Sequence, residues 1–227
     1  MNNHTCYMCD NLATTKEHVP PKCLFPEKKD LKDISLDLRK ALIKAPSCVD
    51  HNCKKSGDDE YLFNVLSMTI QTGKYGLLNF ESKVMRSWTR KDRISKLKEK
   101  LLSTARTVKI KDPESEDIFE ALELTIDRDR LKEVLKCCAL GLYYYEFGKK
   151  YKGSIHSTPL FSPILDKNWI EQQSQMEDYY SNKFKNIKRK GDNPEIFQYA
   201  FYQDTFNNML VVQMWFYEEC KVISFFR

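Results

Sequence analysis

The sequence predicts an α+β fold with two unequal parts. Residues 1–62 are rich in Cys, His, Pro and Lys and lack long helical periodicity, which is typical of a small domain with a sparse apolar core. From residue 63 onward, helical patterns dominate. The chain then changes to aromatic and β-branched runs separated by turn-forming residues, which indicate an antiparallel β-sheet. We therefore predict an N-terminal domain over 1–62 and a mainly helical region with C-terminal strands over 63–227.

Composition limits the class of protein. A hydrophobic fraction of 41% in 227 residues fits a folded globular chain. Charges interrupt every apolar run, and the first twenty residues carry no secretory pattern, so we expect a cytoplasmic protein with no membrane partner. The net charge of +5 permits a polyanionic partner without requiring one. Eight cysteines in such a chain are better interpreted as metal ligands or small buried side chains than as disulfides.

The region after residue 62 can be assigned element by element from its periodicity and its turn residues. A helix that starts near Glu60 is expected to end by Gly73 and Gly76. Asp127 or Asp129 can cap a further helix, and Gly148 can end it. The remaining expectations are a basic amphipathic helix from Ser87 through the stretch ending at 111, a loop over 109–117, a short strand over 121–127, a loop over 149–163, a helix over 168–184, and strands over 195–203, 208–217 and 221–227.

Two short motifs in residues 1–62 have the spacing of metal-ligand pairs. CYMC places Cys6 and Cys9 two residues apart, and SCVDHNC places Cys48 and His51 at the same spacing. Two such pairs complete a closed tetrahedral zinc site of the structural kind, which can stabilise a region with few apolar residues. Cys53 is the alternative fourth ligand. The competing interpretation, incidental core cysteines, does not explain two pairs in one short polar segment.

An acid and a histidine lie between the two pairs. Glu17 and His18 stand in EHVPP, and Asn52 follows the second pair directly. A neutral imidazole can take a proton from water, whereas a carboxylate and an amide oxygen suit Mg²⁺ or Mn²⁺. Together they match one-metal hydrolysis of a phosphodiester.

These residues resemble a known family. EHVPP, followed by PSC-x-x-HN-x-x-KS-x-DDEY within a Cys-x-x-Cys framework, is similar to the HNH endonucleases with the ββα-metal fold. The resemblance implies that His18 is the general base, that Glu17 and Asn52 bind the catalytic metal, and that the four Cys and His residues bind structural zinc. Glu17 stands where the common acid is Asp, and His51 where a cysteine is common. The resemblance also implies a nuclease that cuts double-stranded DNA, in restriction, phage defence or mobile-element biology.

Other basic residues are candidates for nucleic-acid contacts. Lys54 and Lys55 follow Asn52 and could contact phosphates, as could the stretches 86–106 and 183–190, although each also fits an ordinary solvated face. Two alternatives stay open: a zinc-stabilised module that binds nucleic acid or protein without cutting it, and an RNA-cleaving enzyme of the same family. The C-terminal region could select a substrate, form a homo-oligomer or bind an accessory defence protein.

Overall fold

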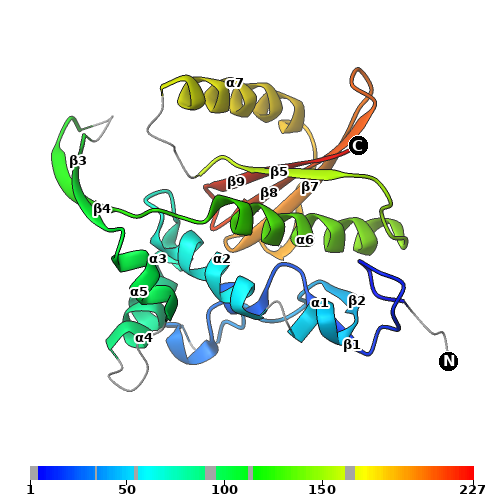
Figure 1. The fold of residues 1–227 in the computed structure, drawn as a ribbon, viewed down its shortest axis with the longest axis horizontal. Helices are drawn as coiled ribbons and strands as arrows, with labels where there is room; N and C mark the ends of the chain where they lie inside the picture. The colour runs from blue at the N-terminus through cyan, green and yellow to red at the C-terminus, as the bar shows by residue number, and fades with distance from the viewer. Residues whose placement is uncertain (1–4, 34, 54–55, 90–95, 112–114, 162–166) are drawn as a thin grey trace.

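The computed structural model describes residues 5–33, 35–53, 56–89, 96–111, 115–161 and 167–227, and it shows a mixed α+β protein (Figure 1). Small two-stranded sheets and helices occupy the first half of the chain, and a five-stranded antiparallel sheet follows in the second half. The α+β class and the C-terminal antiparallel sheet are therefore confirmed. Among the described residues, no helix is long and apolar enough to cross a membrane.

The N-terminal part is built on a short β-hairpin that runs directly into a helix. Its strands pair antiparallel, with His18 opposite Lys44 and Glu17 opposite Ala45. The long connection between the two strands holds two single-turn 3₁₀ helices. In chain order the elements are β1 (Thr15–His18), η1 (Lys22–Leu24), η2 (Lys28–Asp30), β2 (Lys44–Ser47), α1 (Val49–Cys53) and α2 (Ser56–Met68).

The middle of the chain departs from the sequence expectations in two places. The helix before Gly73 ends at Met68, as expected, but Gly73 precedes a further helix that the sequence did not predict, and Gly76 lies buried inside it. The basic stretch is helical only in part, because residues 106–111 form a strand of a two-stranded hairpin, and this strand includes the first residues of the loop expected over 109–117. The elements are α3 (Lys74–Asn79), the π-helical turn η3 (Phe80–Val84), α4 (Met85–Thr89), α5 (Lys96–Leu102), β3 (Arg106–Lys111) and β4 (Ile118–Glu123).

Helix α6 (Arg128–Phe147) begins and ends where the sequence predicts. The Asp127 side chain accepts a hydrogen bond from the Arg130 N–H, and Gly148 ends the helix in the left-handed conformation with φ 65°. Its apolar face is fully buried and includes Leu131, Leu135 and Leu142. This helix packs against α2, β2 and the large sheet, so it joins the N-terminal hairpin to the C-terminal half.

The five-stranded sheet has both faces covered. Alternate residues of the central strand β8, such as Val212 and Trp215, belong to different buried clusters on opposite faces. Helix α7 covers one face and α6 lies on the other (Figure 1). The strand order is β5-β9-β8-β7-β6. The elements are β5 (Ile155–Pro159), α7 (Lys167–Phe184), β6 (Lys190–Asn193), β7 (Phe197–Asp204), β8 (Met209–Phe216) and β9 (Cys220–Phe226). Strand β5 corrects the expected loop over 149–163.

One buried core runs from the N-terminal loop to the sheet. Its members extend from Cys6 and Tyr7 to Phe226, and α2 passes through position 62 without a break. A buried polar junction adds to this connection. The Tyr217 hydroxyl donates to the Leu24 carbonyl at 2.8 Å, and the Asn79 amide donates both to that carbonyl and to the Tyr217 oxygen. The division of the chain at residue 62 stays a prediction.

Candidate metal centre and adjoining pocket

Three cysteines and a histidine meet where the N-terminal loop approaches the start of α1. Cys6 and Cys9 come from the loop before β1, Cys48 follows β2, and His51 lies in α1. Their ligand atoms all lie within 4.8 Å of one another. The hairpin is what brings the two pairs together, because Thr15, near the first pair, is paired with Ser47, beside the second. These four side chains, which the sequence predicted as ligands, can hold a metal ion.

The distances within this cluster fit a tetrahedral ion. The Sγ atoms of Cys9 and Cys48 are 3.8 Å apart, and Nδ1 of His51 lies 3.2 Å from Cys48 Sγ and 3.6 Å from Cys6 Sγ. With Zn–S of about 2.3 Å and Zn–N of about 2.0 Å, the edges of a tetrahedron are about 3.8 Å for S···S and about 3.5 Å for S···N. The donor set and its spacing therefore fit zinc.

Backbone groups favour the thiolate form that a metal requires. The Met8 N–H donates to Cys6 Sγ at 3.5 Å. The backbone N–H of His51 bonds to the Cys48 sulfur and is the main cause that lowers the pKa of that thiol to about 6. Because the thiolate is the metal-binding form, Cys48 is ready to bind a cation at neutral pH.

The remaining cysteines play no part in this cluster in the described portion of the chain. The side chain of Cys53, the alternative fourth ligand, lies outside the described residues, whereas His51 is present in the cluster. Burial raises the pKa of both Cys23 and Cys220 to about 12. These two thiols therefore stay protonated, as expected for cysteines that serve as packing side chains.

A polar pocket of about 320 Å³ lies at the end of β1. Glu17, His18 and Asn52, the three residues that the sequence singled out for chemistry, all line it. The full lining comes from β1, η1, α1, α2 and the Pro21 turn: Glu17, His18, Pro21, Lys22, Cys23, Asn52, Asp59, Glu60 and Phe63. The hairpin and the two helices thus bring these side chains together, and their catalytic roles stay a prediction.

Glu17 is an acid in an almost fully buried position. Its side chain is 3% exposed, and its Oε2 accepts a hydrogen bond of 3.1 Å from the Tyr7 hydroxyl. A buried carboxylate requires hydrogen bonds or a cation to offset its lost hydration. Its place in the pocket wall makes Glu17 suited to bind a cation there.

His18 is half-buried and lies in a basic environment. Burial of the ring lowers its pKa below the ordinary value, and the positive charges of Lys44, Lys22 and Arg39 lower it further. A lowered pKa keeps the imidazole neutral at physiological pH. The ring can therefore accept a proton from a bound water molecule.

Asn52 is tied to the hairpin through its amide nitrogen. The Nδ2 group donates to Thr15 Oγ1 at 2.9 Å. This bond fixes the orientation of the Asn52 side chain, which lies on α1, relative to β1. It engages the nitrogen rather than the carbonyl oxygen, which is the atom that would bind a cation.

Two acidic residues of α2 also line the pocket, and the sequence reasoning did not assign them to the site. The sequence predicts the start of a helix near Glu60, and α2 begins slightly earlier, at Ser56. Asp58 points to α6, where its Oδ1 lies 2.6 Å from Arg130 Nε, but Asp59 and Glu60 line the pocket. Consecutive side chains of a helix point in different directions, and this geometry could have indicated that neighbouring acids of α2 face different parts of the molecule.

The acids of the pocket do not converge tightly. Among the residues that the structure describes, the cysteine and histidine cluster is the one group of three or more ligating side chains that could hold a metal ion. Glu17, Asp59 and Glu60 line one pocket without forming a second group of this kind.

Comparison with known proteins gives no further assignment. No protein-family model, curated protein or solved structure matches this chain. The case for a function therefore depends on the residues of the cluster and the pocket.

Among the residues that the structure describes, two lysines near the pocket are candidates for phosphate contacts. Lys22 lines the pocket, and Lys44 is exposed opposite His18 in the hairpin. The predicted contacts Lys54 and Lys55 lie outside the described residues. Part of the second basic stretch has structural contacts, because Arg189 lies over the Trp215 ring and Lys190 pairs with Glu146.

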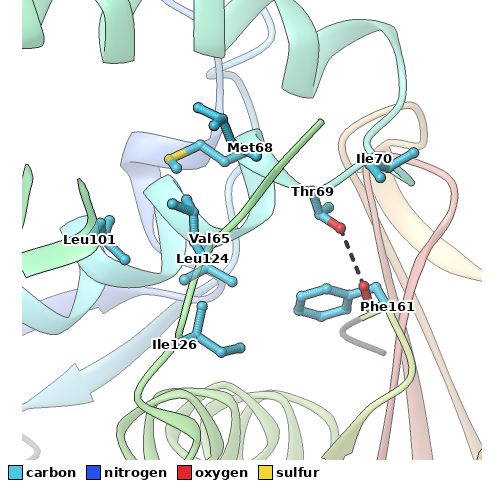
Figure 2. Close-up of a pocket in the computed structure, with 9 residues that line it drawn as sticks. Val65, Met68, Thr69, Ile70, Leu101, Leu124, Ile126 and Phe161 are labelled. Carbon is cyan, nitrogen blue, oxygen red and sulfur yellow. Dashed lines mark hydrogen bonds between the residues drawn. The ribbon is translucent and has the colours of Figure 1, made fainter. Parts of the chain in front are cut away.

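A second pocket, of about 170 Å³, is apolar (Figure 2). It lies between α2, α5 and the end of β4, and Val65, Met68 and Ile126 are among its lining residues. Thr69 closes one side by donating to the Phe161 carbonyl at 3.2 Å. No titratable side chain lines this cavity among the described residues, so it offers no acid or base of its own.

Proposed function

We propose that this protein is a metal-dependent endonuclease of the HNH type, with a zinc-stabilised ββα-metal domain, that hydrolyses phosphodiester bonds in double-stranded DNA. One observation carries the proposal: Glu17, His18 and Asn52 line a single pocket beside a tetrahedral Cys₃His cluster. The hairpin β1–β2 followed by α1 supplies the framework. A role in restriction or phage defence is consistent with such an activity.

Each residue has a distinct role in this reaction. The neutral His18 imidazole takes a proton from the attacking water. The Glu17 carboxylate and the Asn52 carbonyl would hold a divalent cation, and Asp59 would add negative charge to the same cavity. When bound there, Mg²⁺ or Mn²⁺ would stabilise the charge on phosphorus and on the leaving oxygen. Lys22 and Lys44 hold the phosphate backbone near His18.

The metal cluster has a structural role in this proposal. Cys6, Cys9, Cys48 and His51 would hold zinc with all four positions filled by protein, which leaves none for substrate. A closed site of this kind fixes the loop before β1 against α1. The His18 and Asn52 side chains are then held at a constant separation.

The proposal is tested by plasmid cleavage with Mg²⁺ or Mn²⁺, with EDTA as the negative control. Wild type should nick or linearise the plasmid, and His18→Ala should cut at least about 100-fold more slowly, since a general base typically contributes this much or more. His156→Ala is the matched control because His156 is exposed on β5, outside the pocket. Zinc content is measured in every sample.

Three outcomes would count against the proposal. If zinc-loaded His18→Ala cuts as fast as wild type, His18 is not the general base. If the protein cleaves an RNA duplex in preference to DNA of equal sequence, its substrate is RNA and not DNA. Binding of DNA without any cleavage in either metal would favour the alternative, a zinc-stabilised binding module.

A further inference from the structure

Tyr7 stands between two ligands of the metal cluster, in the sequence Cys6-Tyr7-Met8-Cys9. The residue is 1% exposed. Its backbone N–H donates to the Pro46 carbonyl at 2.8 Å, which fixes the loop against β2. The position of Tyr7 is therefore set jointly by the cluster and by the hairpin.

The side chain of Tyr7 reaches from the cluster to the pocket. Its hydroxyl donates to Glu17 Oε2 at 3.1 Å, and both side chains are buried. A carboxylate oxygen can only accept a hydrogen bond, so the Tyr7 hydroxyl is the donor in this pair.

A glutamate that binds a cation must hold its carboxylate in one orientation. Its side chain has three rotatable torsions, and fixing them costs conformational entropy at each binding event. A hydrogen bond to one carboxylate oxygen restricts these torsions before the cation arrives. In the described structure, Tyr7 provides this bond to Glu17 Oε2, and the Glu17 side chain lines the pocket.

We propose that Tyr7 is a positioning residue that couples the cysteine and histidine cluster to the pocket, so that a metal ion in the cluster holds Glu17 ready for the divalent cation. This inference rests on the proposed function, because it takes Glu17 as a ligand of that cation. Tyr7 itself touches neither the cation nor the substrate.

The test measures Mn²⁺ binding directly, by electron paramagnetic resonance, in zinc-loaded protein without substrate. Tyr7→Phe should weaken Mn²⁺ binding about 10-fold or more, the usual effect of losing a partner of a metal ligand. Tyr199→Phe is the matched control: it removes a part-buried tyrosine–glutamate bond, from the Tyr199 hydroxyl to Glu146 Oε1 at 2.6 Å, and neither residue lines the pocket. It should leave Mn²⁺ affinity unchanged.

Glu17→Gln separates the two proposals. If Glu17→Gln weakens Mn²⁺ binding and Tyr7→Phe does not, the positioning role is wrong and the proposed function survives. If Glu17→Gln has no effect, Glu17 is not a ligand and both proposals fall. The visible spectrum of Co²⁺ in place of zinc reports whether the cluster is intact in each variant.

A second variant guards against misfolding of Tyr7→Phe. 3-Fluorotyrosine at position 7 keeps the ring and the hydroxyl but makes the hydroxyl more acidic, which changes the bond to Glu17. Mn²⁺ affinity should shift with this substitution and should not shift with 3-fluorotyrosine at position 199. Equal Mn²⁺ affinities of the wild type and of the two proteins with 3-fluorotyrosine would overturn the inference.

Discussion

Gly141 of α6 lies directly against Val19, the residue that follows His18. A Cβ atom at position 141 would be 2.5 Å from Val19 Cγ2 and 3.0 Å from Cγ1. Val19 is 2% exposed and β-branched, so its side chain has little freedom to move away. The C-terminal half of the molecule therefore sets the position of the end of β1, where the pocket begins.

Gly141→Ala should destabilise the protein and slow cleavage. The overpacking cost exceeds the gain in helix propensity, and we expect a net loss of about 1–2 kcal/mol in the free energy of unfolding. Gly57→Ala is the control, because its Cβ would meet only Arg130 Nη2 at 3.5 Å, an ordinary contact. Urea unfolding and plasmid cleavage measure the two effects. Equal stability of Gly141→Ala and wild type would contradict the close packing.

Chelation should show that the metal cluster is structural. We expect one zinc ion per chain, and its removal by a strong chelator should lower the unfolding temperature and abolish cleavage even when Mg²⁺ is restored in excess. Cys48→Ser should lose the zinc, whereas Cys137→Ser, outside the cluster, should keep it. Atomic absorption and thermal unfolding supply the measurements. Full retention of zinc by Cys48→Ser would exclude this ligand set.

The two neighbouring acids of α2 should differ in their effect on cleavage. Asp59→Asn removes negative charge from the pocket and should reduce cleavage by about 100-fold, as expected when electrostatic support at a reacting centre is lost. Asp58→Asn breaks a part-exposed ion pair with Arg130 and should cost at most about 1 kcal/mol in stability, with near-normal cleavage. Single-turnover rates decide between them. If Asp58→Asn slows cleavage more than Asp59→Asn does, Asp59 has no role in the site.

The basic residues around His18 should set the pH range of activity. Because burial, Lys44, Lys22 and Arg39 lower the pKa of His18, the neutral imidazole persists to lower pH than in an isolated histidine. Lys44→Gln removes one of these charges and raises that pKa, so the acidic limb of the cleavage profile should move to higher pH. Lys109→Gln, exposed on β3, is the control and should leave the limb unmoved. A limb that moves to lower pH in Lys44→Gln would contradict the stated role of this charge.

The parts of the fold that the sequence predicted are those with local signals. Asp127 and Gly148 mark the ends of α6 through capping chemistry that does not depend on the rest of the chain. The strands β7, β8 and β9 show as apolar and aromatic runs because both faces of their sheet are buried. The candidate metal ligands could be predicted because Cys–Cys and Cys–His pairs at fixed spacing have few other uses in such a chain.

The elements that were missed depend on distant partners. Strand β5 is short and contains His156 and Pro159, and it forms only because β9 offers an edge. Tyr7 gave no signal, since a tyrosine between two cysteines resembles any packing side chain until Glu17 is placed next to its hydroxyl. Asp58 and Asp59 are equivalent in sequence, and only the positions of α6 and β1 distinguish their roles.

The buried junction of Tyr217, Asn79 and Leu24 has a consequence during synthesis of the protein. Leu24 ends the single turn η1 that carries Lys22 and Cys23 into the pocket wall. Its carbonyl accepts hydrogen bonds from Tyr217 and Asn79, so this wall is held by a residue that the ribosome adds almost two hundred positions later. A nascent chain that already has its EHVPP histidine and its cysteine pairs still lacks that support. On the proposed function, we therefore expect a complete pocket wall, and with it cleavage, only after the C-terminal strands have been added.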